Sequence, residues 1–158
     1  PDVIIVDYAD LIRGHGQEKR HELEGIYEDL RGMAGEYEIP VWTASQANRS
    51  ALEEDVIDAS KISESYGKVM VADFVLSLSR KIQDKLAGTG RWHVIKNRFG
   101  PDGITLPSKM NLSNGQFNIY TDTSIQGQNT QKQMDNGDEL TKQLLARKYK
   151  ETQNTGFE

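Results

Sequence analysis

The stretch Val3-Ile4-Ile5-Val6-Asp7-Tyr8 decides the fold class of this 158-residue chain. Its apolar residues are β-branched and run without polar interruption, which predicts a strand buried on both faces, as in a parallel sheet covered by helices. Asp7 closes the run, and α/β sheets hold their ligands beyond the carboxyl ends of such strands. We therefore predict an α/β domain with a candidate binding residue at Asp7, although many strands end in an Asp that has only a structural role.

The flanking sequence extends this strand into a sheet. Apolar side chains recur at helical spacing between residues 19 and 38, which predicts an amphipathic helix, and residues 41–44 form the next strand of a right-handed parallel crossover. Further elements are predicted in this order: a short helix within 62–71, a strand over 74–79, a turn over 84–90, and strands over 92–95, 104–106 and 117–120. The fold class is therefore α/β: a parallel sheet with helices, followed by a C-terminal antiparallel β extension.

A change of composition divides the chain after Tyr120. Residues 121–137 are rich in Gln, Asn, Thr, Asp and Gly, which predicts a disordered linker. Residues 138–150 regain helical character, but a helix this short needs a partner surface in water. The expected domains are thus 1–120, the α/β domain, and 121–158, a flexible linker with a short amphipathic helix.

Charge and composition exclude several classes of protein. The net charge of −5 is unlike that of a protein that coats duplex DNA, so any contact with nucleic acid is expected at a local loop or channel. The chain has no cysteine, which excludes disulfides and thiolate metal sites, and its three histidines lack metal-ligand spacing. It contains no apolar run of roughly 18 residues, so no membrane contact is expected.

Two further motifs carry polar groups to strand ends. Trp42-Thr43-Ala44-Ser45-Gln46-Ala47-Asn48-Arg49 places the Gln46 amide just past the second strand; the alternative is a polar loop before a helix. Lys96-Asn97-Arg98-Phe99-Gly100-Pro101-Asp102-Gly103 carries two cations two residues apart, which point to the same side of a strand. Such a pair can reach a phosphate, with Arg98 giving bidentate geometry and Lys96 a point charge; the alternative is a solvated strand end that pairs with a carboxylate such as Asp102.

Taken in order, these motifs resemble the DnaB family of replicative helicases, including its phage versions, over roughly residues 2–120. The resemblance implies part of a RecA-like P-loop ATPase core that uses ATP and Mg²⁺. It implies an ATP-dependent enzyme that forms a homo-hexamer, translocates on single-stranded DNA and unwinds duplex DNA. A primase and a helicase loader are the implied partners, and the cytoplasm of a bacterium or phage-infected host is the implied location. The alternatives are a RecA- or KaiC-like recombinase-type ATPase and a non-catalytic RecA-fold module that binds DNA or a partner.

The resemblance also implies roles for single residues. Asp7 matches the Walker B aspartate, which helps to hold magnesium, and Gln46 matches the glutamine that senses the γ-phosphate. Lys96 and Arg98 match the cations that complete the ATP site of the neighbouring subunit.

Family members bind single-stranded DNA through a loop that corresponds here to residues 61–68. Ser63 stands where the family's loop carries a basic residue. Lys61, Lys68 and the backbone amides near Tyr66 and Gly67 are therefore the candidate DNA contacts, whereas the alternative is that these lysines are merely solvated.

One motif of the family does not occur: the sequence contains no Gly-x-x-x-x-Gly-Lys-Ser/Thr. The family's phosphate loop and catalytic glutamate precede the Walker B strand, and this sequence opens with Pro1 almost directly at that strand. We therefore expect a C-terminal part of a longer helicase, and we expect it not to hydrolyse ATP by itself.

Overall fold

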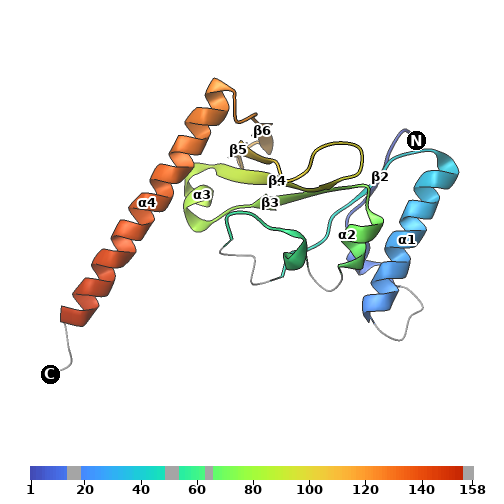
Figure 1. Cartoon of the computed structure of the whole chain (residues 1–158), viewed down its shortest axis with the longest axis horizontal. Helices are drawn as coiled ribbons and strands as arrows, with labels where there is room; N and C mark the ends of the chain where they lie inside the picture. The colour runs from blue at the N-terminus through green and yellow to red at the C-terminus, as the bar shows by residue number, and fades with distance from the viewer. Residues whose placement is uncertain (14–18, 49–53, 63–65, 155–158) are drawn as a thin grey trace. The chain divides into compact units, whose positions relative to one another are not determined.

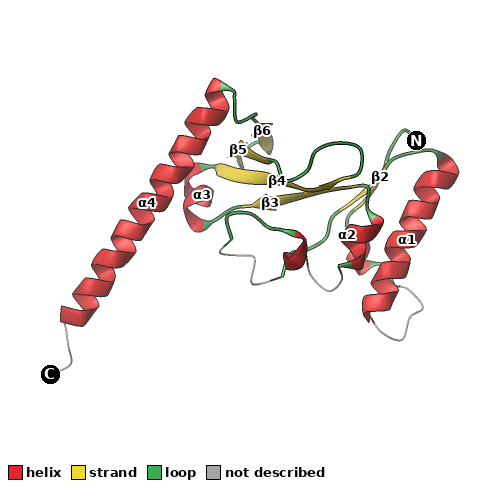
Figure 2. Cartoon of the chain, viewed as in Figure 1, coloured by secondary structure: helices red, strands yellow, loops and turns green. Residues whose placement is uncertain are grey.

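The computed structural model describes residues 1–13, 19–48, 54–62 and 66–154, which belong to two compact units. Unit 1 comprises Pro1–Ser77 and His93–Ile104, and unit 2 comprises Leu78–Trp92 and Thr105–Glu158. Figures 1 and 2 show the elements in order: β1 (Ile4–Val6), α1 (Lys19–Tyr37), β2 (Val41–Thr43), α2 (Gly67–Val71), β3 (Phe74–Ser79), α3 (Ile82–Ala87), β4 (Thr89–Asn97), β5 (Thr105–Asn111), β6 (Gln116–Ile119) and α4 (Ile125–Asn154). No described helix is both long enough and apolar enough to span a bilayer.

Unit 1 contains the predicted strand–helix–strand arrangement. Strands β1 and β2 pair in parallel, with Ile4 opposite Val41, and α1 connects them. The helix buries the stripe that its apolar spacing predicted, and the resulting core contains Ala9, Leu23, Ile26, Tyr27 and Leu30. Helix α1 also packs against α2, as Figure 1 shows. The predicted parallel α/β core is therefore confirmed. The predicted burial of the first strand on both faces is wrong, because Ile5 of β1 is 74% exposed.

The remaining strands form a four-stranded sheet in the order β3-β4-β5-β6. Strands β5 and β6 are antiparallel, with Ser108 opposite Ile119, so the predicted antiparallel extension is also confirmed. A turn that includes Asn114 and Gly115 joins them, and Gly115 has a φ of 68°, a region that favours glycine.

The predicted turn over residues 84–90 is wrong in its first half, which forms helix α3. The Asp84 carboxylate accepts a hydrogen bond from the Lys81 amide at 2.9 Å and so caps the start of this helix. Gly88 ends the helix in the left-handed conformation, with a φ of 67°. A Cβ on Gly88 would lie 2.9 Å from the Met110 carbonyl oxygen, so the neighbouring strand also requires a glycine here.

The predicted linker over residues 121–137 is also wrong, because α4 runs from Ile125 to Asn154. The Ser124 hydroxyl caps this helix by accepting from the Gly127 amide at 2.9 Å. The helix buries Thr130 and Met134 and packs against α3 and β5. Its buried positions are mostly small or polar, so they gave no apolar periodicity in the sequence. The boundary between domains at residue 120 stays a prediction.

Candidate functional site

The first two predicted site residues both lie past the carboxyl ends of the paired strands β1 and β2, and Tyr8, the residue after Asp7, links their segments. Asp7 directly follows β1 and is exposed, and the Asp7–Tyr8 peptide bond is cis. The Gln46 amide Nε2 donates to the Tyr8 hydroxyl at 3.0 Å. Parallel pairing therefore brings together two motifs that are far apart in the sequence, as expected for a ligand site of an α/β sheet.

Thr43, the last residue of β2, ties these two strand ends together. Its hydroxyl donates to the Val6 carbonyl oxygen at 2.9 Å and accepts from the Ala9 amide at 2.9 Å. The segment that carries Asp7 is thus bound on both sides to the segment that carries Gln46.

A buried ion pair that the sequence did not predict lies beside this edge. The Lys68 ammonium lies 2.9 Å from Asp10 Oδ2 and donates to the Ser45 hydroxyl at 3.2 Å. The Tyr27 hydroxyl donates to Asp10 Oδ1 at 2.9 Å; burial raises the pKa of Tyr27, and the Asp10 carboxylate raises it further. The Lys68 side chain is only 3% exposed. A contact with a DNA phosphate needs an exposed ammonium, so the structure argues against the predicted role of Lys68.

The other predicted DNA contacts remain at the surface of unit 1. The Lys61 ammonium lies 3.0 Å from Glu54 Oε1, and both side chains are partly exposed. Tyr66 is exposed and Gly67 begins α2. Ser63 lies outside the described residues. DNA binding by this loop stays a prediction.

Lys96, near the end of β4, is bound to the carboxyl end of α2. Its ammonium donates to the carbonyl oxygens of Val69 at 2.9 Å and Met70 at 2.8 Å. Burial lowers the pKa of Lys96, and the positive charge of Arg98 lowers it further. Two of its three donors are therefore engaged within unit 1.

Arg98, just past β4, pairs with Asp73 rather than with Asp102. Arg98 Nε lies 3.0 Å from Asp73 Oδ1, and the Arg98 amide donates to the Asp73 carbonyl oxygen at 2.9 Å. Arg31 Nη1 from α1 lies 3.0 Å from the same carboxylate oxygen. Asp73 directly precedes β3. This position next to a strand was the one feature of the sequence that could have indicated Asp73 as a site residue.

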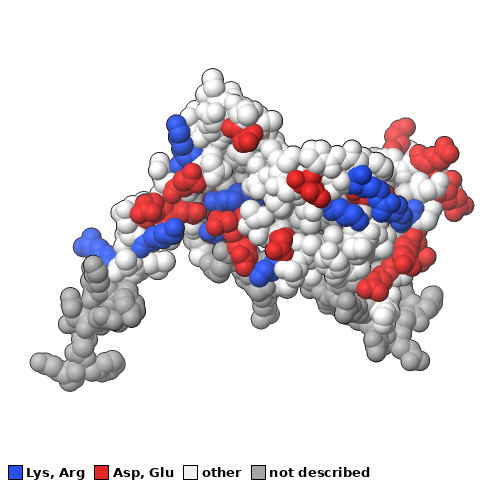
Figure 3. Space-filling model, viewed as in Figure 1, with Lys and Arg blue, Asp and Glu red and all other residues white. Residues whose placement is uncertain are grey.

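The surroundings of Arg98 carry an excess of positive charge. The positive charges of Arg31 and Arg98 both act on Lys96, and the negative charge of Asp73 opposes them. On the face drawn in Figure 3, basic and acidic side chains both occur. An anion next to Arg98 would be attracted by this cluster.

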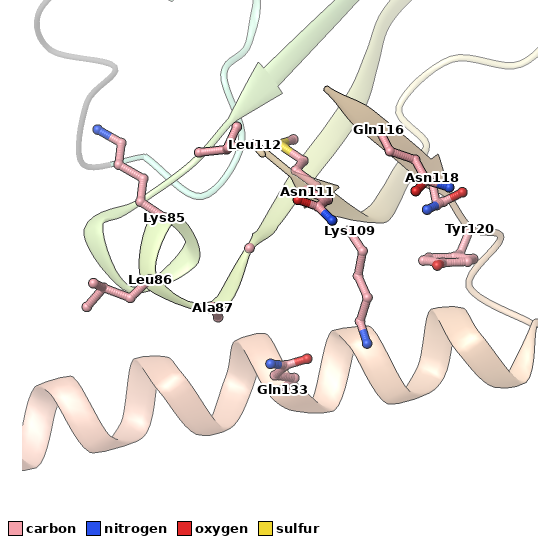
Figure 4. Close-up of a pocket in the computed structure, with 12 residues that line it drawn as sticks. Lys85, Leu86, Ala87, Lys109, Asn111, Leu112, Gln116, Asn118, Tyr120 and Gln133 are labelled. Carbon is pink, nitrogen blue, oxygen red and sulfur yellow. The ribbon is translucent and has the colours of Figure 1, made fainter. Parts of the chain in front are cut away.

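An open hollow of about 600 Å³ lies in unit 2, between α3, β5, β6 and α4. Figure 4 shows its polar lining, with Lys109 pointing toward α4. None of the predicted site residues is among the residues that line it.

The residues at the β1 edge fit the magnesium ion that the sequence motifs imply. Magnesium prefers oxygen ligands and usually keeps several waters, so one or two carboxylates together with phosphate oxygens suffice. The exposed Asp7 carboxylate can supply such a ligand. The described residues contain no cluster of three or more metal-ligating side chains, the arrangement of a closed protein site.

The chain belongs to the family of the DnaB-like helicase C terminal domain, whose model matches residues 1–115. It is 32% identical over 105 residues to the DnaB-like replicative helicase of Enterobacteria phage T4, covering 63% of this chain and 22% of that protein. It is 33% identical over 89 residues to a probable plasmid replicative DNA helicase of Chlamydia trachomatis, covering 51% of this chain and 18% of that protein. The chain thus spans about a fifth of the length of these curated relatives.

Two solved structures share the fold. The first, "ATPase Domain of G40P", has a TM-score of 0.65 and 23% identity, and the match covers 73% of this chain and 43% of that one. The second, "The Structure Of A DnaB-Like Replicative Helicase And Its Interactions With Primase", has a TM-score of 0.62 and 22% identity, covering 70% and 29%. Together with the family match, these similarities confirm the predicted α/β fold class, part of the RecA-like fold.

Proposed function

We propose that this chain is part of an ATP-driven, ring-forming replicative DNA helicase and supplies both faces of its inter-subunit ATP sites. The observation that carries the proposal is the hydrogen bond from Gln46 to Tyr8, the residue after Asp7, past two parallel strands in a member of this family. In the full-length enzyme one subunit would present Asp7 and Gln46, and its neighbour would present Arg98.

The chemistry of each residue follows from its surroundings. Magnesium bound with ATP supplies charge neutralisation at the phosphates, and Asp7 would help to hold it. Gln46, oriented by Tyr8, would hydrogen-bond the γ-phosphate or the attacking water. Arg98 would stabilise the negative charge that develops on the transferred phosphoryl group. Lys96 would act chiefly through its charge, because its ammonium is engaged with α2.

The partners of the full-length enzyme are part of the same proposal. Single-stranded DNA would contact the loop around Lys61, Tyr66 and Gly67 in the channel of a homo-hexamer. A primase and a helicase loader would bind the assembled ring, and it would act in the cytoplasm of a bacterium or a phage-infected host. The solved helicase structure whose description includes primase supports the first of these two partners by analogy.

Mixed rings of the full-length enzyme test the proposal. Arg98→Ala subunits and Asp7→Ala subunits should each form rings that hydrolyse ATP very slowly. Rings mixed from both should regain part of the activity, because an Arg98→Ala subunit still offers Asp7 to a neighbour that retains Arg98. The measurement is the ATPase rate against the mixing ratio.

The control mixes Asp7→Ala subunits with Lys109→Ala subunits, whose substitution is at an exposed lysine of unit 2. In this control the ATPase rate should be proportional to the fraction of ATP sites that have both Asp7 and Arg98. Wild-type hydrolysis by Arg98→Ala alone, with no recovery on mixing, would refute the proposed trans-acting site.

A further inference from the structure

We propose that Asp73 is a positioning residue that orients the Arg98 guanidinium toward an anion. The proposal deepens the proposed function and rests on it, since it assigns a partner to the residue that would act on the neighbouring subunit's phosphate. Asp73 would touch neither ATP nor DNA and would act through Arg98 alone.

The contact between the two residues has two parts. The Arg98 amide donates to the Asp73 carbonyl oxygen at 2.9 Å, which fixes the two backbones side by side. The carboxylate of the same residue then lies 3.0 Å from Arg98 Nε. An arginine side chain has many rotamers in solution, so a backbone contact and a side-chain contact with one residue restrict it strongly.

The choice of nitrogen matters for what Arg98 can still bind. Asp73 contacts Nε, whereas the four N–H groups of Nη1 and Nη2 carry the geometry that matches two oxygens of a phosphate. The Arg98 side chain is 45% exposed, so these groups can be reached from outside unit 1. The contact at Nε is an ion pair and not an aligned hydrogen bond, because no described donor hydrogen-bonds Asp73 Oδ1. The charge of Asp73 therefore draws the guanidinium toward itself without occupying its outer edge.

Asp73 is itself fixed by Arg31. Arg31 Nη1 lies 3.0 Å from the carboxylate oxygen that faces Arg98, and it also donates to the Val71 carbonyl oxygen. The Asp73 side chain is 42% exposed, and ion pairs this exposed contribute little to stability. Stability alone therefore gives a weak reason for this arrangement, whereas orientation of Arg98 gives a direct one.

The test uses the full-length enzyme with Asp73→Asn, which keeps the backbone contact and removes the charge. We expect kcat for DNA-stimulated ATP hydrolysis to fall about 10- to 100-fold, the range for a misplaced catalytic group. The KM for ATP should change by less than about threefold, because Arg98 acts mainly in the transition state. Asp102→Asn is the matched control: it removes an exposed carboxylate close to Arg98 in the sequence and should leave kcat unchanged.

A double-mutant cycle separates positioning from a general structural effect. If Asp73 acts through Arg98, then Arg98→Ala and Arg98→Ala combined with Asp73→Asn should have the same residual kcat. A further loss in the double variant would overturn the proposal, as would a wild-type kcat for Asp73→Asn while Arg98→Ala is impaired. Wild-type hydrolysis by Arg98→Ala would instead refute the proposed function. If Asp73→Asn does not form rings, Asp73→Glu keeps the charge but displaces it, and a wild-type kcat in that variant would also overturn the proposal.

Discussion

Strand β4 and the residue just past it supply the arginines of two arginine–aspartate pairs, which have the same chemistry and opposite surroundings. Arg91 Nη1, in unit 2, lies 2.6 Å from Asp84 Oδ2, and the two side chains are 6% and 1% exposed. Arg98 Nε, in unit 1, lies 3.0 Å from Asp73 Oδ1, and these side chains are 45% and 42% exposed. The buried pair, Arg91–Asp84, is therefore placed to stabilise the fold. The exposed pair, Arg98–Asp73, can be reached by a ligand.

Hydrogen bonding explains why the buried pair is tolerated. Asp84 also accepts from the Thr89 hydroxyl at 3.0 Å and from the Lys81 amide at 2.9 Å, so both carboxylate oxygens have partners. Arg91 reaches a second carboxylate, Asp138 of α4, at 3.5 Å. A buried charge with every position satisfied is stable where it is but costs several kcal/mol when its partner is removed. The exposed pair contributes little to stability, and the outer N–H groups of Arg98 can bind a phosphate while Asp73 stays beside Nε.

The largest expected effect is on catalysis and comes from the exposed pair. Arg98→Ala in the full-length helicase should lower ATP hydrolysis by about 10³-fold or more, the range for arginine fingers. The same change should alter the free energy of unfolding by only about 0–1 kcal/mol, because the pair is half exposed. ATPase rates and urea denaturation of one preparation measure both. A large loss of stability with little loss of hydrolysis would show that the Arg98–Asp73 pair stabilises the fold and does not act in catalysis.

The next effect is on stability and comes from the buried pair. Arg91→Ala should lower the free energy of unfolding of unit 2 by about 3–5 kcal/mol, because it leaves the Asp84 carboxylate buried without its cation. The chain has two tryptophans, Trp42 in unit 1 and Trp92 in unit 2, so a Trp42→Phe background lets Trp92 report on unit 2 alone. Urea denaturation followed by Trp92 fluorescence gives the value.

The exposed Lys109→Ala in the same background is the control for Arg91→Ala and should change the stability by less than about 0.5 kcal/mol. An equally small effect of Arg91→Ala would mean that unit 2 does not depend on its buried pair.

The smallest expected effect concerns the Tyr27–Asp10 contact of unit 1. The pKa of Tyr27 is raised above its ordinary value of 10.0 by burial and by Asp10, so the folded state holds this proton more tightly than the unfolded state. Its contribution to stability is complete below pH 10 and is lost as the pH rises above 10. In a Trp92→Phe background, Trp42 should report a stability of unit 1 that falls more steeply above pH 10 than in Tyr27→Phe. Equal slopes would show that the contact does not survive in solution.

Local patterns made some elements predictable and left others hidden. The run that ends at Asp7 and the stripe of α1 were visible because their large apolar side chains follow the patterns of a strand and a helix. The stripe of α1 is buried, whereas Ile5 in the run is 74% exposed. Helix α4 was hidden because its buried residues include Gly127 and Thr130, which carry no large apolar side chain. A Cβ on Gly127 would lie 1.9 Å from the Thr121 carbonyl oxygen, so the segment leading into the helix requires the residue that lowers helix propensity.

The sequence by itself determined the order of the elements, the parallel strand–helix–strand core and the positions of Asp7, Gln46 and Arg98 at strand ends. These features depend on the periodicity of neighbouring residues, which the sequence displays directly. Only the tertiary structure decided the partners: Tyr8 for Gln46, Asp73 for Arg98 and Asp10 for Lys68. Partners of charged groups depend on distance and burial between segments far apart in the chain, and those quantities exist only once the chain has folded.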